Sequence, residues 1–160
     1  MSERKQREFW IGIAIFVSIL LWVAWQFLWP EFQQASSTRN MKAIHAGLER
    51  YLDKHGEWPQ LPDSMSGPHE SGFVEFWKDA LEPHGVTERM WHRPGDGIDR
   101  DRSSSSYIPT MYGKGELTPY RSALQPWLIE RSNFGGDGPL VILPDGKVMP
   151  SDGLIPGSPP

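Results

Sequence analysis

The stretch FWIGIAIFVSILLWVAWQFLW, from Phe9 to Trp29, decides the fold because its 21 residues include no formally charged side chain. As a helix with a rise of about 1.5 Å per residue it would reach about 31 Å, enough to cross a bilayer core. Tryptophans stand near both ends, Trp10 at one and Trp25 and Trp29 at the other, as is typical of a membrane-spanning helix. The stretch therefore predicts a transmembrane helix at 9–29.

A cleaved signal peptide is the alternative interpretation of this stretch. Signal peptides usually have a shorter apolar region that is followed directly by small residues at the cleavage site. The residues WPEF at 29–32 follow here, and they favour a retained anchor. Arg4, Lys5 and Arg7 precede the span, which favours a cytoplasmic N-terminus and a domain on the other side. In a bacterium, this predicts a single-pass inner-membrane protein with a cytoplasmic tail at 1–8 and a periplasmic domain.

Composition restricts what the remaining chain can be. Of the 160 residues, about 130 remain outside the span, enough for one modest domain. The net charge of −4, with no basic stripe outside the N-terminal tail, argues against a nucleic-acid partner. Because cysteine is absent, disulfides and thiolate metal sites are excluded. The 16 glycines and 15 prolines predict a loop-rich domain.

An amphipathic pattern beyond the span predicts a helix that enters the domain at 30–56. Apolar residues recur at helical spacing between Gln33 and His55, namely Met41, Ile44, Leu48, Tyr51 and Leu52. Gly56 and Pro59 predict where this helix ends. Two arrangements stay open. One long helix could pass Pro30 with a kink, or a separate helix could begin at the N-capping residues 36–38.

The globular domain at 57–150 is expected to contain one more helix and several short strands. The helix is predicted at Gly72–Glu82, with an apolar face made of Phe73, Phe76, Trp77, Ala80 and Leu81. Strands are predicted at 86–91, at 106–108 and at 140–143, the last joined through Asp145-Gly146 to an antiparallel return at 147–149. The stretch 117–131 is ambiguous because Pro119 and Pro126 limit any helix. We expect the tail at 151–160 to be disordered.

Four motifs, in order, resemble those of prepilin-type proteins, in particular type II secretion pseudopilins. LWP at 28–30 looks like the Leu-Leu-Pro that closes the family's apolar segment. NMKAI at 40–44, with Leu48, Tyr51, Gly56 and WP at 58–59, is similar to the stretch that follows it. WHRPGD at 91–96 looks like F-x-C-P-S-D, with Arg93 in place of the cysteine. PWLIE at 126–130, followed by residues 135–146, resembles the terminal block with its DG hairpin.

The resemblance implies an α+β, pilin-like fold, in which a long N-terminal helix packs on a small antiparallel sheet. It also implies cleavage by a prepilin peptidase between a glycine and a phenylalanine. Here Glu8 stands where the family has that glycine, and Ile13 replaces the glutamate inside the span. A charged residue at the cut and the loss of the carboxylate predict that the chain stays uncut.

Candidate chemical groups are sparse. The five histidines, His45, His55, His69, His84 and His92, lack metal-ligand spacing and are expected to be surface or partly packed imidazoles. Asp96, Asp99 and Asp101 could hold Ca²⁺, although a solvated charged loop is the favoured interpretation. The serines at 103–106 have no plausible base, so nucleophilic catalysis is disfavoured. The glycines at 135–138 lead into a strand and not a helix, so they do not form a phosphate-binding loop. Trp58, Trp77, Trp91 and Trp127 could form a sugar-stacking face, but burial is favoured.

These observations predict a protein without enzymatic activity, with no catalytic, cofactor-binding or metal-ligating residues and no cofactor. The favoured function is that of a membrane-anchored pseudopilin-like structural or assembly protein. Its expected partners are the lipid bilayer and other pseudopilin-like or secretion-system proteins. The alternative is a stand-alone membrane-anchored periplasmic binding domain, for example for cell-wall polysaccharide, on the same fold. A membrane-bound hydrolase is disfavoured because no catalytic constellation is present.

Overall fold

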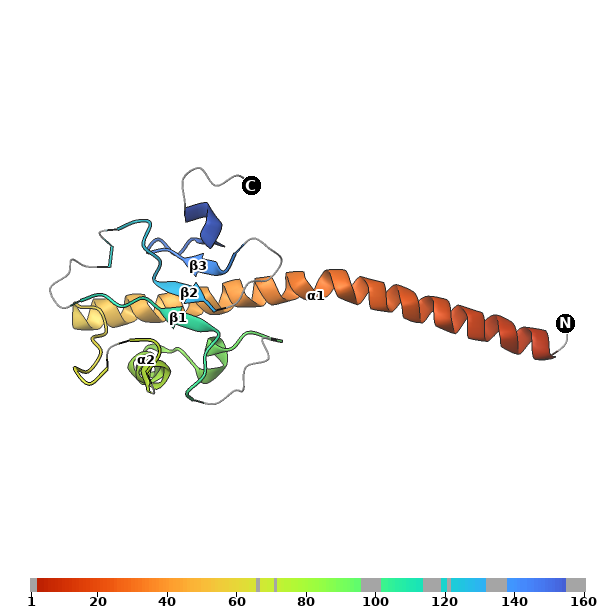
Figure 1. Ribbon diagram of the computed structural model, residues 1–160, viewed down its shortest axis with the longest axis horizontal. Helices are drawn as coiled ribbons and strands as arrows, with labels where there is room; N and C mark the ends of the chain where they lie inside the picture. Colours follow the sequence, from red (N-terminus) through yellow and green to blue (C-terminus); the bar gives the residue numbers. More distant parts are fainter. Residues whose placement is uncertain are drawn as a thin grey trace.

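One helix, α1 (Glu3–His55), runs through the whole structure, and the domain is built around its C-terminal half (Figure 1). The structure is a computed structural model that describes residues 3–65, 67–70, 72–95, 102–113, 119–120, 122–131 and 138–154, with side chains from Trp10 onward. In Figure 1 the N-terminal half of α1, in red, extends away from every other element. The molecule thus has a bare helical half and a packed helical half.

The helix passes Pro30 without interruption over its 53 residues. One proline removes a single backbone hydrogen bond, and the helical turns on both sides hold the helix together. The continuous helix is therefore confirmed, and the alternative of a separate helix beginning at 36–38 is wrong. The hydroxyl of Ser37 does not cap a helix; it donates a hydrogen bond to Glu130 Oε1 at 2.7 Å.

The N-terminal half of α1 is apolar and exposed from Trp10 to Leu28. It contains an 18-residue window of mean hydropathy 2.2, no part of which is buried. By length and composition this helix can cross a membrane.

The C-terminal half of α1 provides the spine of the domain core. Its predicted apolar face is confirmed, since Met41, Ile44 and Leu48 are fully buried and Leu52 is nearly so, while Tyr51 is half-buried. The helix ends as predicted at Gly56, whose N–H donates to the Leu52 carbonyl oxygen at 2.7 Å and whose φ is 74°. Burial of this face is what joins the bare half of α1 to the domain.

A four-stranded antiparallel sheet of order β1-β2-β3-β4 lies along this half of α1. Its strands are β1 (Tyr107–Pro109), β2 (Leu128–Glu130), β3 (Leu140–Ile142) and β4 (Val148–Pro150). Two of the sequence predictions are confirmed here, the strand at 106–108 and the C-terminal hairpin. The α+β class is confirmed as well.

The turn of the C-terminal hairpin is longer than a two-residue turn. Gly146 N–H donates to the Leu143 carbonyl oxygen at 2.9 Å, and Leu143 N–H donates to the Lys147 carbonyl oxygen at 3.0 Å. Pro144 therefore occupies the second turn position, where its fixed φ is favourable. Gly146 has a φ of 77°, so the glycine is required by the left-handed backbone that closes the hairpin.

A second group of short helices packs on α1 beside the β1 edge of the sheet (Figure 1). It consists of α2 (Phe73–Leu81) and the 3-10 helices η1 (Glu82–His84) and η2 (Glu88–Trp91). The predicted face of α2 is confirmed at Phe73, Trp77 and Leu81, which are buried. All four candidate sugar-stacking tryptophans, at 58, 77, 91 and 127, are buried in the core with at most 2% of their surface exposed.

Three predictions of secondary structure differ from the structure. The strand predicted at 86–91 is the 3-10 helix η2, because residues 87–89 are exposed in succession and cannot alternate as a half-buried strand does. The ambiguous stretch 117–131 contains β2, whose pairing with both neighbours overrides its weak local signal. The tail predicted to be disordered begins with a 3-10 helix, η3 (Ser151–Leu154), and its remainder at 155–160 lies outside the described residues.

Candidate functional site

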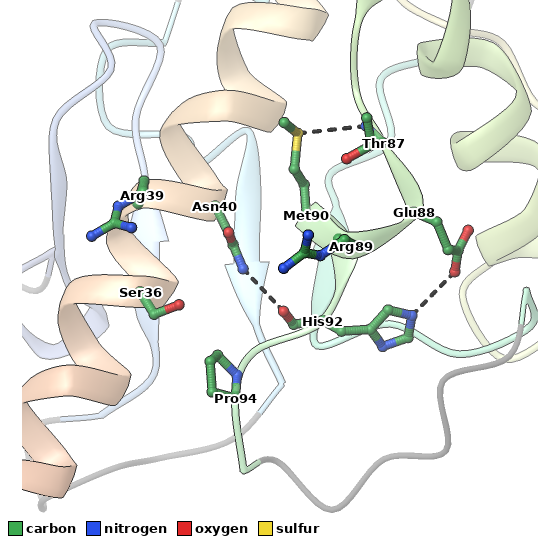
Figure 2. A pocket seen from close by; sticks show the side chains of 9 residues that line it. All are labelled: Ser36, Arg39, Asn40, Thr87, Glu88, Arg89, Met90, His92 and Pro94. Atoms are coloured by element: carbon green, nitrogen blue, oxygen red, sulfur yellow. Dashed lines mark hydrogen bonds and ion pairs between the residues drawn. The ribbon is translucent and has the colours of Figure 1, made fainter.

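A pocket of about 400 Å³ opens where η2 crosses α1 (Figure 2). One wall is the α1 face at residues 36–40, and the other is the segment from Thr87 to Pro94. Its lining residues are Ser36, Arg39, Asn40, Thr87, Glu88, Arg89, Met90, His92 and Pro94. The sequence did not indicate this pocket, because its two walls are about 50 residues apart along the chain and neither carries a recognisable motif.

The pocket is held open by contacts between these two walls. Asn40 Nδ2 donates to the carbonyl oxygen of His92 at 3.0 Å, which fixes the end of η2 to the helix. Further along, the backbone at Gly95 lies against α1 so closely that a Cβ there would be 2.4 Å from Gln33 Nε2 and 3.2 Å from Trp29 Cζ2. The φ of 75° at Gly95 favours glycine at this crossing, and the segment 92–95 lies on the helix.

The single acidic side chain of the pocket is already neutralised. Glu88 Oε1 lies 2.5 Å from Lys78 Nζ and 3.1 Å from His92 Nε2. Burial by itself raises the pKa of Glu88, but the hydrogen bonds from Lys78 and His92 outweigh it and hold that pKa below its ordinary value. Glu88 is therefore ionised at neutral pH, and its Oε1 is engaged on the far wall.

The two arginines of the pocket have no such partner. Within the described part of the chain, neither Arg39 nor Arg89 makes an ion pair or a side-chain hydrogen bond, and both are exposed. Figure 2 shows Arg89 pointing from η2 toward the α1 wall, while the Arg39 side chain on that wall extends away from η2. Because Glu88 is balanced, the pocket carries an excess of positive charge in a protein whose net charge is −4. The arrangement is suited to an anionic ligand.

Beneath the pocket, a buried ion pair connects its far end to the sheet. Arg93 Nη1 and Glu130 Oε1 are 2.8 Å apart, and their side chains are 1% and 3% exposed. Glu130 also accepts hydrogen bonds from Ser37 Oγ at 2.7 Å and from Leu140 N–H at 3.3 Å. The carboxylate thus joins three segments, namely α1, β3 and the segment after η2.

Tyr107 extends this buried network. Its hydroxyl donates to Ser37 Oγ at 3.1 Å. Burial raises the pKa of Tyr107 to about 12, against the lowering effect of hydrogen bonds with Ser37 and Asn40. The phenol is therefore neutral and serves as a donor. Arg93 itself is further fixed through its N–H, which donates to Ser106 Oγ at 2.9 Å.

Arg93 is the residue that the resemblance to prepilin-type proteins sets against a cysteine. The sequence showed this substitution but not its partner. The available signal was Glu130, a carboxylate that follows Leu128 and Ile129 in an apolar run. Glu130 stands at the end of that apolar run, whereas Arg93 stands between His92 and Pro94, and nothing local says that the two charges meet.

The expectation for the histidines is wrong at three of five positions. His45, His84 and His92 are buried, whereas His55 and His69 are exposed. His45 Nε2 lies 3.0 Å from the Pro144 carbonyl oxygen, and its ring stacks on Trp127 at 4.5 Å, so it supports the hairpin. No group of three or more potential metal-ligating side chains occurs among the described residues.

The remaining candidates divide into placed and unplaced residues. Ser105 and Ser106 are buried and hydrogen-bonded to backbone groups around β1, which is a structural role. The aspartates at 96, 99 and 101 and the glycines at 135 and 136 lie outside the described residues.

Comparison of the chain with protein-family models, with curated proteins and with solved structures gave no match. The functional argument for this α+β protein with a protruding apolar helix therefore rests on its own residues.

Proposed function

We propose that this protein is a membrane-anchored, pseudopilin-like structural or assembly protein of a type II secretion-like system. In this proposal the first half of α1 spans the bacterial inner membrane, the N-terminus is cytoplasmic and the domain is periplasmic. The observation that carries the proposal is the continuity of α1 through Pro30, since one rigid element is both the apolar span and the spine of the domain. Pilin-like proteins are expected to combine a span and a spine in this way.

Continuity of the helix has a mechanical consequence that fits assembly. A contact made in the membrane sets the orientation of the domain, because no flexible joint separates the two halves of α1. The exposed apolar surface from Trp10 to Phe32 can contact both lipid and neighbouring helices. Ile13, 37% exposed on that surface, offers packing but no carboxylate for a neighbour's amino terminus. Lateral association with an assembly fits this surface better than forming the body of a filament.

The edges of the sheet favour the helix as the surface for partners. Proline has no N–H to offer an added strand, and each edge strand carries one, Pro109 in β1 and Pro150 in β4. On β1, Ser105 Oγ also engages both Tyr107 N–H at 3.0 Å and the Tyr107 carbonyl oxygen at 2.8 Å. Edges of this kind oppose strand addition between chains.

The alternative of a glycan-binding domain loses its main candidate surface. A sugar-stacking face requires exposed aromatic rings, and the four tryptophans proposed for it are buried against α1 and the sheet. No other observation favours this alternative over assembly.

Site-specific crosslinking in native membranes tests the proposal. A photo-crosslinking residue is placed at Phe16, which is 62% exposed on the apolar half of α1, and as a matched control at Leu124, which is 63% exposed on the domain. We expect Phe16 to capture pseudopilin-like or other secretion-system membrane proteins, identified by mass spectrometry. Capture of no protein from Phe16, with only lipid adducts formed, would overturn assembly through the helix.

A further inference from the structure

We propose that the pocket between α1 and η2 binds the phosphate group of an anionic phospholipid from the membrane that holds α1. The inference rests on the anchoring part of the proposed function and adds a ligand to it. Its starting point is the pair of arginines, Arg39 and Arg89, which have no acidic partner among the residues that the structure describes.

The chemistry of the pocket selects a phosphate ester. Guanidinium groups present several N–H donors in a planar fork that matches phosphate oxygens. Ser36 adds a hydroxyl on the α1 wall. Glu88 does not repel an anion strongly, because the ammonium group of Lys78 neutralises it. The charge that remains for a ligand is positive.

The position of the pocket along α1 selects the membrane as the source of the phosphate. Trp29 is the last aromatic residue of the apolar span, and Ser36 and Arg39 follow it by seven and ten residues. At about 1.5 Å per residue these positions are about 10 and 15 Å beyond the hydrocarbon edge, while the headgroup region is roughly 5–8 Å deep. Helical side chains lean toward the N-terminus, so the Arg39 side chain leans back toward the membrane. Its length covers much of the distance between its own position on α1 and the headgroup region.

The second wall reaches down to the same level. Gly95, which follows the lining residue Pro94, lies against Trp29 and Gln33 on α1. In Figure 1 this green segment extends along α1 toward the N-terminal half beyond β1 and α2. The pocket is consequently on the membrane-proximal side of the domain, where headgroups are concentrated.

Thermal unfolding of the full chain in neutral detergent, with added lipid, tests the proposal. The probes are phosphatidylglycerol, phosphatidylcholine and soluble glycerol phosphate. A ligand that binds only the folded state raises Tm with its concentration. We expect phosphatidylglycerol to raise Tm and the two other probes to have much less effect at equal concentration.

The pocket variant Arg39→Gln with Arg89→Gln should weaken the apparent affinity for phosphatidylglycerol by about tenfold or more, the loss expected for charge-assisted hydrogen bonds. Its matched control, Lys42→Gln with Arg131→Gln, removes the same charge from exposed positions outside the pocket and should keep the response. An equal response in the two variants would overturn the pocket. An equal response of the original chain to glycerol phosphate would overturn the lipid as the source.

Alkaline carbonate extraction of membranes separates this proposal from the one on which it rests. A chain that stays in the membrane but shows no preference for phosphatidylglycerol refutes only the lipid site. A chain that carbonate releases refutes the anchor, and with it both proposals.

Discussion

Breaking the buried ion pair between Arg93 and Glu130 should be among the most costly changes in this domain. The two groups are 2.8 Å apart and almost completely buried, so removing one leaves the other as a charge without its main partner. Such a change costs about 3–5 kcal/mol of folding free energy. For a domain of marginal stability, about 5–15 kcal/mol, this is a large share of the total.

The two further contacts of Glu130 sharpen this prediction. After Arg93→Ala, the carboxylate keeps the donors Ser37 Oγ and Leu140 N–H. After Glu130→Ala, those donors lose their acceptor and the guanidinium loses its counter-ion. We therefore expect Glu130→Ala to be the more destabilising of the two, and the double variant to cost clearly less than the sum of the single costs.

Chemical denaturation of the full chain in mild detergent, followed by near-ultraviolet circular dichroism, gives the four free energies of this cycle. A second pair of changes, Arg93→Met with Glu130→Leu, provides a control for charge alone, since apolar replacement of a buried pair is often neutral or stabilising. Strictly additive single costs, with no coupling between positions 93 and 130, would refute the assignment of an ion pair.

Four other predictions follow from single features. Leu48→Ala should cost about 2–5 kcal/mol because Leu48 is fully buried on α1, whereas the exposed Leu124→Ala should cost little, as compared by denaturation. Gly146→Val should destabilise the hairpin more than Gly146→Asn, since asparagine tolerates a φ of 77° better than a β-branched residue, and equal stabilities would contradict the turn. Because the folded pKa of Glu88 lies below its usual 4.5, its contribution to stability is present above that value and is lost as pH falls through the folded pKa. Denaturation across acidic pH should therefore show a shallower decline for Glu88→Gln, and identical profiles would contradict this. Finally, mass spectrometry of the membrane-extracted protein should find the bond between Glu8 and Phe9 intact, and a methylated amino terminus at Phe9 would refute the prediction.

The features that the sequence predicted correctly are those that depend on neighbouring residues. The apolar helix follows from 21 consecutive uncharged residues, and the core face of α1 follows from the spacing of Met41, Ile44 and Leu48. The C-terminal hairpin follows from an apolar run, the turn dipeptide Asp145-Gly146 and a short return. The main chain of each of these elements is stabilised by contacts that are close in sequence, so the local pattern contains the necessary information.

The features that only the tertiary structure decided depend on residues far apart along the chain. β2 exists because β1 and β3 pair with it on both sides, while its own sequence, limited by nearby prolines, is ambiguous. Pro30 could have ended or kinked the helix. Instead α1 continues past Pro30, and its later turns are buried against the sheet. Arg93 and Glu130 are 37 positions apart, and the walls of the cationic pocket are about 50 apart. Which charges meet, and which are left for a ligand, is determined by packing over the whole domain, because a side chain's local sequence fixes its chemistry but not its neighbours in space.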